Sequence, residues 1–470
     1  MHDTYTACLE DFISFVQKAK QRYGISFSDT ILSYSFINEF PIAGDSFARL
    51  LDSESLALLL SGPENTGELF GSGAVYVVAS NSVEHFHDLR NGIKNMPKLF
   101  EEHNGTGNPP LFFGAMKFAS NENDPLWSEF KDSYWFIPSL IMRTINNQTI
   151  VTINTYVGEE FDLSHITKRF ESYLDKLERI TENHDTTELP YVIDSKGCGE
   201  DDKNRWRWLV QETKEYIKEK KVSKLVVARR EEYVLSSIPT ISDVVTTLAE
   251  QNPLATVYAF KKRDSVFLGA TPETLLQVKQ NVFYTEAIAG TQPRGAQSEE
   301  DSRNEATLLG SEKEQLEHKI VSDYILSQLE PLVDNLKKGS SPVVKKFSRI
   351  QHLQTTFNGD LKSNSSSLQV LEALFPTPAV CGLPKDNAYD LIKELEFTGR
   401  GLFAGTLGWF NIYNDCNMIV SLRCGLLQGN KLYSFAGCGI VEGSDPDQEF
   451  EETQLKFRTI RSVFEHGKNQ

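Results

Sequence analysis

Apolar residues recur along the chain in two patterns, one typical of helices and one typical of short strands. Between residues 312 and 332 they stand at positions 316, 320, 321, 324, 325 and 329, which predicts a helix with one buried face. Comparable segments predict further helices at 9–23, 206–221, 368–374, 388–395 and 446–464. Apolar runs of strand length predict strands at 74–79, 111–118, 134–138, 149–157, 225–228, 255–260, 265–269, 404–413, 418–427 and 431–436.

Many of the predicted strands are separated by turns of hairpin length, and the helices are interspersed among them without strict alternation. This order favours an α+β fold with antiparallel sheets over a fold in which strands and helices alternate regularly. The polar segment 181–203 is the best candidate for a linker. It divides the chain into two regions, 1–200 and 201–470.

The composition is that of an ordinary globular protein, with 40% hydrophobic and 24% charged residues among 470. The net charge of −17 and the lack of a basic run argue against nucleic acid and anionic membranes as partners. No apolar run is long enough to cross a bilayer, and the first residues lack the features of a signal peptide, so we expect a cytoplasmic protein. The six cysteines have no paired spacing, which indicates neither a zinc site nor a disulfide framework.

Two acidic pairs are the strongest chemical signal in the sequence. Glu449 and Glu452 follow a glycine-rich turn and are spaced so that they share one helix face with Lys456. The second pair, Glu314 and Glu317, stands on an earlier predicted helix. Four carboxylates from two helices are typical of a Mg²⁺ site that can hold a carboxylate substrate. The alternatives are structural, since acidic residues complement a helix dipole or form the solvated edge of a helix.

Three further residues have both a chemical and a structural interpretation. Lys224 opens a strand and could act as a general base, or be an ordinary exposed strand end. Glu273 follows a strand and turn that would direct it into a cleft as a proton donor, or be a first-turn glutamate after proline. Arg423, within the apolar strand 420–425, would bind a carboxylate that belongs to a substrate or to a structural ion pair.

Glycine-rich turns recur at 289–295, 404–408 and 436–439. None of them has the lysine and hydroxyl residues of a phosphate-binding loop, so the sequence does not support nucleotide binding. Their backbone N–H groups suit the close approach of a small anion instead. We therefore expect these turns to contribute to a site for a small anionic substrate.

In combination and in this order, these signals resemble the chorismate-utilising enzymes, which include isochorismate, salicylate, anthranilate and aminodeoxychorismate synthases. The likeness covers residues 205–465. Its motifs are Lys-Leu-Val-Val-Ala-Arg-Arg230, Phe-Leu-Gly-Ala-Thr-Pro-Glu273, Ile-Ala-Gly-Thr-Gln-Pro-Arg-Gly295, Glu-Gln-Leu-Glu317-His, Pro-Thr-Pro-Ala-Val-Cys-Gly-Leu-Pro-Lys385 and the terminal Ala-Gly-Cys-Gly-Ile-Val with Glu-Phe-Glu-Glu452.

The resemblance implies a role for each of the four glutamates. Glu317 and Glu452 would be direct Mg²⁺ ligands, and Glu314 and Glu449 would support the ion through water. The metal would hold the ring carboxylate of chorismate and polarise the ring.

The resemblance also implies the residues that bind and transform the substrate. Arg423, Lys456 and nearby glycine amides would hold the enolpyruvyl carboxylate. Lys224 would deprotonate the water that attacks C2, while Glu273 protonates the departing C4 hydroxyl. The implied substrate-binding positions are Gly290, Thr291, His352, Ala379, Arg423, Gly437, Gly439 and Lys456.

Four positions distinguish the branches of the family. Anthranilate synthases tend to carry glutamine at Lys224, and aminodeoxychorismate synthases place a lysine at Ala289, so this chain is similar to the enzymes that add water. Salicylate synthases have threonine at Ala379, and alanine fits an enzyme that stops at isochorismate. Phe375 departs from the histidine common in isochorismate synthases.

The resemblance favours an isochorismate synthase for menaquinone or siderophore biosynthesis. The alternatives are a salicylate synthase, an amination enzyme with a glutaminase subunit, and a chorismate-binding relative without turnover.

The resemblance implies one compact α+β architecture, similar to anthranilate synthase component I. It is a large antiparallel sheet sandwich with helices on the outside. Region 1–200 would be integrated with the catalytic region 201–470. For a chain of this kind we expect no glutaminase subunit, and we expect a monomer.

Overall fold

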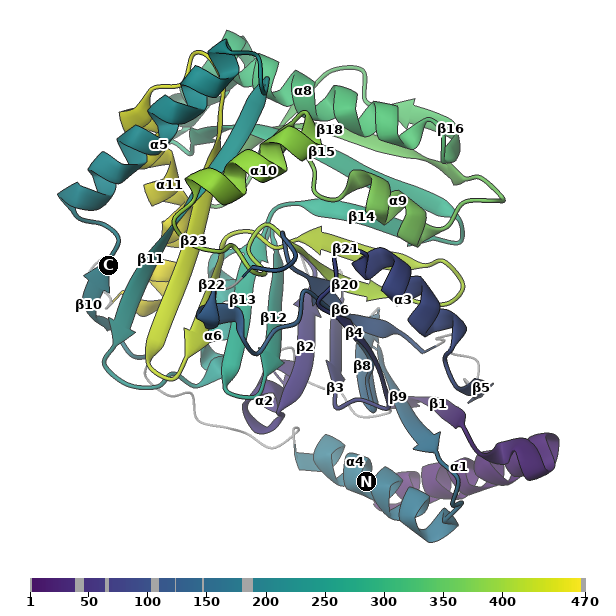
Figure 1. Cartoon of the computed structure of the whole chain (residues 1–470). Coiled ribbons are helices and arrows are strands. Elements are labelled where there is room, and N and C mark those ends of the chain that lie inside the picture. The colour runs from purple at the N-terminus through teal and green to yellow at the C-terminus, as the bar shows by residue number, and fades with distance from the viewer. Residues whose placement is uncertain are drawn as a thin grey trace.

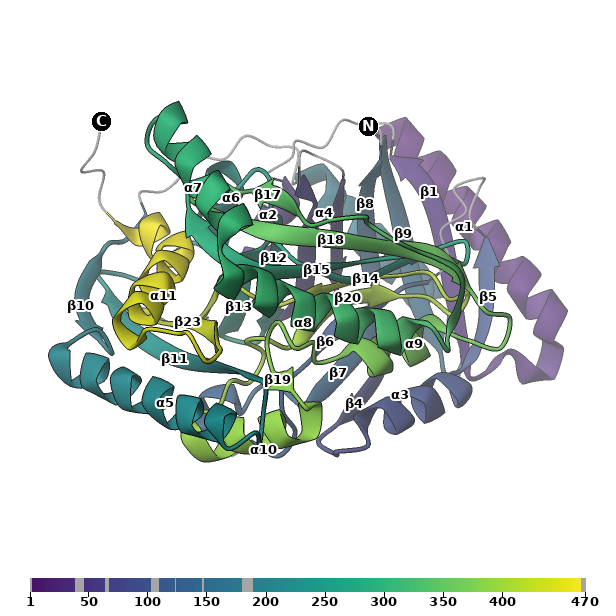
Figure 2. The same cartoon turned by 90° about the horizontal axis from the view of Figure 1, so that it is seen from above.

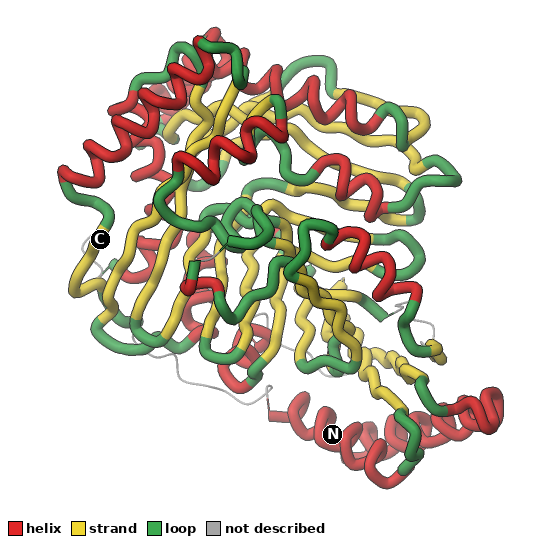
Figure 3. The backbone as a smooth tube through the Cα atoms, viewed as in Figure 1, coloured by secondary structure: helices red, strands yellow, loops and turns green. Residues whose placement is uncertain are grey.

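Two large β-sheets packed face to face form the body of the protein, and most helices lie on the outside (Figures 1 and 3). The computed structural model describes residues 2–38, 46–63, 67–102, 110–122, 124–145, 148–179 and 189–465. Within these residues one sheet has 13 strands and the other has 10. Nearly all neighbouring strands are antiparallel, so the predicted α+β class is confirmed.

The larger sheet begins at β10 and ends at β5. Only β1 and β5 pair in parallel among its described strands. Its order is β10 (Val192–Lys196), β11 (Lys224–Leu235), β23 (Lys431–Ile440), β22 (Cys424–Gln428), β13 (Ser265–Thr271), β12 (Thr256–Lys262), β2 (Leu56–Ser61), β3 (Glu68–Ser72), β8 (Leu140–Ile145), β9 (Gln148–Val157), β1 (Thr30–Asn38) and β5 (Lys98–Glu102), with β19 (Gly382–Leu383) paired to β11.

The smaller sheet is antiparallel throughout its described strands. Its order is β16 (Val333–Lys338), β18 (Ile350–Leu361), β15 (Val282–Pro293), β14 (Thr274–Lys279), β21 (Cys416–Val420), β20 (Thr406–Phe410), β6 (Phe112–Met116), β7 (Ser133–Ile137) and β4 (Tyr76–Ser80), with β17 (Val343–Lys346) paired to β18. Both sheets therefore combine strands from before and after residue 200. Part of the proposed linker 181–203 lies outside the described residues, and the rest contains β10 and the start of α5 (Glu200–Lys218).

Alternation along the strands builds one core on each face of the larger sheet. In β12, Tyr258 and Phe260 face the core between the two sheets, whereas Val257 and Ala259 face a second core on the opposite side. This second core is covered by α1 (His2–Tyr23), α2 (Ser46–Ser53), α4 (Leu163–Arg179) and α6 (Ile241–Gln251). Full burial of a side chain such as Phe260 contributes roughly 1.5–3 kcal/mol to folding.

The remaining helices position the two sheets and the residues between them. Their bounds are α2 (Ser46–Ser53), α3 (His85–Lys94), α4 (Leu163–Arg179), α5 (Glu200–Lys218), α6 (Ile241–Gln251), α7 (Ser298–Gly310), α8 (Glu312–Leu329), α9 (Ser367–Leu374), α10 (Lys385–Leu395) and α11 (Pro446–Arg461). Figure 2 shows α5 and α11 at the end of the larger sheet formed by β11 and β23. No helix in the described part of the chain has the length and apolar character needed to cross a membrane.

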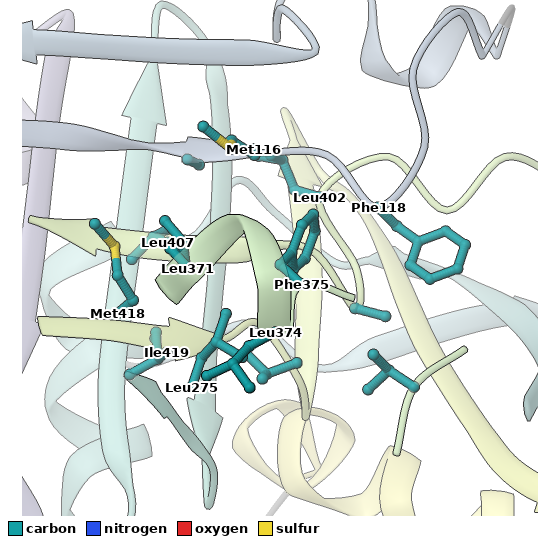
Figure 4. Close-up of a cluster of buried hydrophobic side chains, with 14 of the residues drawn as sticks. Met116, Phe118, Leu275, Leu371, Leu374, Phe375, Leu402, Leu407, Met418 and Ile419 are labelled. Atoms are coloured by element: carbon teal, nitrogen blue, oxygen red, sulfur yellow. The ribbon is translucent and has the colours of Figure 1, made fainter. Parts of the chain in front are cut away.

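Figure 4 shows how α9 is anchored to the smaller sheet. Leu371 and Leu374 of this helix are buried beside Leu407 of β20 and Met418 and Ile419 of β21. The side chain of Phe375, which departs from the histidine of the resemblance, belongs to the same cluster and is not a cavity residue.

Two local predictions are wrong. The strand expected at 418–427 is two strands that belong to different sheets, β21 and β22, because the chain turns at Arg423 with a positive φ of 51°. The buried face of α8 is also shifted at its start, where Leu316 is 51% exposed while Glu314 and His318 are buried. This first half of α8 faces a polar site, so apolar spacing does not describe its packing.

Candidate active site

The sequence-predicted residues gather at a cavity of about 70 Å³ where the β11–β23 end of the larger sheet meets β15 and β18. The cavity lies between strands of both sheets and the helices α8 and α11. The predicted residues that line it are Glu273, Gly290, Thr291, Glu317, His352, Ala379, Arg423, Gly437, Gly439, Glu452 and Lys456. Lys224, Glu314 and Glu449 do not line this cavity, but each contacts a group in or beside its wall.

Lys224 is the first residue of β11, and its side chain is completely buried. Its Nζ lies 3.0 Å from Oε1 of Glu317 in an ion pair. The contact lacks hydrogen-bond geometry, so Nζ has no hydrogen-bond acceptor among the described residues. Gly439 allows this approach, because a Cβ atom there would lie 2.3 Å from Oε1 of Glu317 and 2.7 Å from Cε of Lys224. The alternative of an exposed strand end is wrong.

Glu273 follows β13 and is 5% exposed at the cavity wall. Burial, and then the charge of Glu286, raises the pKa of Glu273 to about 8, while Lys224 and Arg423 oppose the shift. The carboxyl group is therefore mostly protonated at neutral pH and can donate a proton. Lys224 lies on the other side of Glu317, which lines the same cavity as Glu273.

Arg423 lies in the turn between β21 and β22, not inside a strand as predicted. Its Nη2 donates to Nε2 of His352 at 3.1 Å, and Nδ1 of His352 donates to the carbonyl of Gly290 at 2.9 Å. Burial and then the charge of Arg423 lower the pKa of His352 to about 3, so this imidazole is neutral and can accept from Arg423. Within the described residues Arg423 has no ion pair, which leaves its charge available to an anionic substrate.

The acidic residues of α11 lie opposite those of α8. Glu452 is paired with Lys456 at 2.6 Å, and Nζ of Lys456 also donates to the carbonyl of Gly437 at 2.8 Å. Asp445 accepts from the backbone N–H groups of residues 447 and 448 and so caps the start of α11. Glu449 is nonetheless buried and faces the site.

Lys313 joins the two acidic helices and was not singled out from the sequence. Its Nζ lies 2.6 Å from Oε1 of Glu449 and 3.5 Å from Oε1 of Glu314. Although burial opposes the shift, these carboxylates raise the pKa of Lys313. The available signal was a lysine directly before the acidic pair of α8. The alternative of a solvated edge is wrong for Glu314, which is 6% exposed.

The chemistry of the four glutamates fits a divalent cation. Burial and then the charge of Glu317 raise the pKa of Glu314 to about 7, and burial and then Glu452 raise that of Glu449. Such mutual repulsion is relieved by a shared cation. In the described part of the chain, however, no three His, Cys, Asp or Glu side chains are already grouped as a metal site. The glutamates are held by lysines instead, so the Mg²⁺ site stays a prediction.

Two details of the cavity wall were not predicted. The backbone N–H of Thr291 donates to Oε2 of Glu314 at 3.0 Å, so this amide is occupied by a glutamate. Arg400 also lines the cavity, where its Nη1 and Nη2 donate to the carbonyls of Val380 and Val226 at 2.7 and 2.8 Å. A single arginine after a glycine carries no sequence signal that would have predicted these buried hydrogen bonds.

A family model described as chorismate binding enzyme matches residues 28–465. The chain belongs to the chorismate binding enzyme family. It is 29% identical to isochorismate synthase MenF of Bacillus subtilis (strain 168) over 414 residues, which cover 86% of this chain and 86% of the relative. It is 35% identical to the salicylate biosynthesis isochorismate synthase of Pseudomonas aeruginosa over 262 residues, 56% of this chain and 55% of the relative.

Solved structures of this family share the fold. The menaquinone-specific isochorismate synthase MenF from Escherichia coli aligns with a TM-score of 0.78 at 20% identity, covering 98% of this chain and 100% of that one. Anthranilate synthase component I from Streptococcus pneumoniae TIGR4 aligns with a TM-score of 0.70 at 20% identity, covering 84% and 92%. The predicted membership in the chorismate binding enzyme family and the predicted architecture are both confirmed.

Proposed function

We propose that this chorismate binding enzyme is a Mg²⁺-dependent isochorismate synthase. The observation that carries the proposal is that a protonated buried carboxyl, Glu273, lines the cavity while a buried amine, Lys224, lies just behind its wall and contacts Glu317 of that wall. An acid and a base whose environments differ in this way are what a coupled addition and elimination requires. The names of several relatives, including MenF and DhbC of Bacillus subtilis, support the same activity and its place in menaquinone or siderophore biosynthesis.

The reaction adds one molecule of water to the ring at C2 and releases one from C4, so the atoms of substrate and product balance. Lys224 accepts a proton from the water that attacks C2 of chorismate, and the ring double bond shifts as the C4–O bond breaks. Glu273 donates its proton to the departing C4 hydroxyl, which leaves as water. Glu317, which is ion-paired with Lys224 at 3.0 Å, would turn to the metal and leave Lys224 free to accept that proton.

The four glutamates would hold the magnesium ion. Glu317 and Glu452 would bind it directly, and Glu314 and Glu449 would support it through water. Bound there, Mg²⁺ supplies a charge that orients the ring carboxylate and stabilises the developing negative charge. Lys313 and Lys456 form ion pairs with Glu449 and Glu452. When the metal binds these glutamates, the two lysines would take new partners.

The other end of the substrate is an enolpyruvyl carboxylate. Arg423 presents a charged guanidinium without an ion pair among the described residues, and Lys456 stands on the same cavity. Both are suited to bind that carboxylate. The small side chains of Ala289 and Ala379 line the cavity and supply neither a nucleophilic amine nor a hydroxyl group. The proposed reaction requires no glutaminase subunit, and we propose a monomer in the cytoplasm.

Purified protein incubated with chorismate and Mg²⁺, with and without ammonium, tests this function. We expect isochorismate as the accumulating product, with the same yield when ammonium is present. Salicylate with an equal amount of pyruvate would show a lyase activity in addition, and an aminated product would contradict the proposal. Binding of chorismate without consumption would also contradict it. Product chromatography separates all four outcomes.

Replacing Glu286 with glutamine is expected to move the alkaline limb of the kcat/KM profile to lower pH. The charge of Glu286 is second only to burial in raising the pKa of Glu273. Without that charge, Glu273 loses its proton at lower pH, by on the order of one pH unit. Lys345, whose Nζ lies 2.9 Å from Glu286, would lose its partner. Its unpaired charge lowers the pKa of Glu273 and so moves the alkaline limb in the same direction.

The control for Glu286 is Glu299→Gln, which removes an equal charge from an exposed position on α7. Its alkaline limb should match that of the unaltered protein. An unchanged limb in Glu286→Gln would remove Glu273 as the group that sets it.

A further inference from the structure

Arg400 lines the catalytic cavity, yet its guanidinium is bound by the protein itself. The residue is 2% exposed, and all three guanidinium nitrogens donate to other residues. Nε donates to Oε2 of Glu396 at 2.9 Å. Nη1 and Nη2 donate to the carbonyls of Val380 and Val226. Because Glu396 neutralises the guanidinium, Arg400 is not suited to bind a substrate carboxylate as Arg423 is.

The two carbonyls that Arg400 binds belong to two segments of the cavity wall with different tasks. Val226 lies two residues after the proposed base, Lys224, in β11. Val380 follows Ala379, one of the positions that distinguish the branches of the family. Strand β19 pairs with only the first two residues of β11, and Arg400 joins the same two segments directly beyond that pairing. The guanidinium therefore fixes the start of β11 relative to the segment that carries residue 379.

The amino-terminal region supports Arg400 on its backbone and on its side chain. Oε1 of Glu122 accepts the backbone N–H of Arg400 at 3.2 Å, and Oε2 accepts that of Gly401 at 2.7 Å. The ring centroid of Phe118 lies 4.2 Å from Cζ of Arg400. Gly401 has a φ of 52°, and a Cβ atom there would lie 2.0 Å from the ring of Trp127. The amino-terminal region thus reaches the wall of the catalytic cavity through Arg400.

We propose that Arg400 is a positioning residue for the reaction and that Glu122 holds it in place. The inference rests on the proposed function, since it concerns where Lys224 stands relative to the substrate. Reacting groups that are displaced by about 1 Å can lose about 100-fold in rate. Arg400 touches no reacting atom, and the groups proposed to bind the substrate, Arg423 and Lys456, do not depend on it. Its loss should therefore lower kcat and leave KM for chorismate nearly unchanged.

The test measures kcat and KM for chorismate in two variants of the full-length protein. Arg400→Lys keeps the charge, but an ammonium cannot replace a planar guanidinium that serves two carbonyls and a carboxylate. The second variant combines Arg400→Met with Glu396→Gln, so that no carboxylate is left buried without a partner. Its glutamine can still accept the backbone N–H of Ala228, which Glu396 accepts at 2.8 Å. In both variants we expect kcat to fall by about 10–100-fold, with KM within about threefold.

The matched control is Lys393→Gln, which removes an exposed charge from α10 outside the cavity. Both of its kinetic constants should equal those of the unaltered protein. Thermal midpoints of all the variants identify any loss of folding.

A double-mutant cycle tests whether Glu122 acts through Arg400. Glu122→Ala alone should lower kcat about tenfold, because two backbone N–H groups lose their acceptor. When it is added to Arg400→Lys, it should lower kcat by less than about twofold more, since coupled residues are not additive. Two effects that multiply in full would show that Glu122 acts independently and would overturn its assigned role.

Three kinetic outcomes are distinct. A kcat within about threefold of the unaltered protein in both Arg400 variants would overturn the positioning role. A large rise in KM with unchanged kcat would also overturn it, because Arg400 would then bind the substrate. If the unaltered protein forms no isochorismate, the proposed function itself fails, whereas normal turnover by the unaltered protein and by both variants contradicts this inference alone.

Discussion

Replacing Lys224 with alanine is expected to lower kcat/KM for isochorismate formation by about 10²–10⁴-fold, the contribution typical of a general base. Lys224 is fully buried behind the cavity wall, where it contacts the wall residues Glu317 and Gly439. Chorismate affinity should change little, because Arg423 and Lys456 are untouched. Steady-state kinetics and a separate binding titration distinguish the loss of the base from the loss of the site.

Two companion variants sharpen the Lys224 result. Lys221→Ala removes an exposed lysine three residues earlier and should retain full activity. Lys224→Gln retains a polar side chain of similar length and should be nearly as inactive as the alanine variant, because an amide is not a base. Turnover within a few-fold of the unaltered protein in both Lys224 variants would assign the base to another group.

Replacing Glu452 with glutamine is expected to raise the Mg²⁺ concentration needed for half-maximal activity by at least about 100-fold, since even residues behind metal ligands change affinity by 10–100-fold. Burial favours the neutral form of Glu452, but Lys456 and Lys313 outweigh it and lower its pKa, so the group is an anion at neutral pH. Glutamine removes that charge at nearly constant size. Activity at saturating Mg²⁺ should also fall, because the ring carboxylate loses its anchor.

A readout without turnover completes the Glu452 experiment. Mg²⁺ should raise the thermal midpoint of the unaltered protein, since an ion that binds only the folded state stabilises it. That rise should be reduced in Glu452→Gln and preserved in Glu451→Gln, which changes the exposed residue directly before it. Equal Mg²⁺ titrations for the two variants would contradict the ligand assignment.

The sequence predicted the architecture well where the pattern is local. Helix α11, with its cap at Asp445, and strands such as β9 and β12 follow from periodicity and capping residues within short windows. The gathering of Glu317, Glu452 and His352 at one cavity was accessible only through the order of the family's motifs. No local pattern indicates that α8, α11 and β18 meet.

The missed features depend on contacts between distant segments. The turn at Arg423 interrupts an otherwise continuous apolar run, and only the pairing of β21 and β22 with different sheets reveals it. In the sequence Lys313 looks like an ordinary surface lysine. Only the fold shows that α11 places Glu449 within 2.6 Å of it. The buried first half of α8 likewise shows no apolar stripe, because its neighbours are the polar groups of the site.

The interleaving of early and late strands has a consequence for attempts to divide the protein. In the larger sheet β12 pairs with β2, and in the smaller sheet β20 pairs with β6. A fragment that starts after residue 200 would lose both partners and expose two long, apolar strand margins to solvent. Such margins recruit other chains and promote aggregation. We therefore expect residues 201–470 to aggregate when they are produced alone, and to be recovered in soluble form when the amino-terminal region is produced with them.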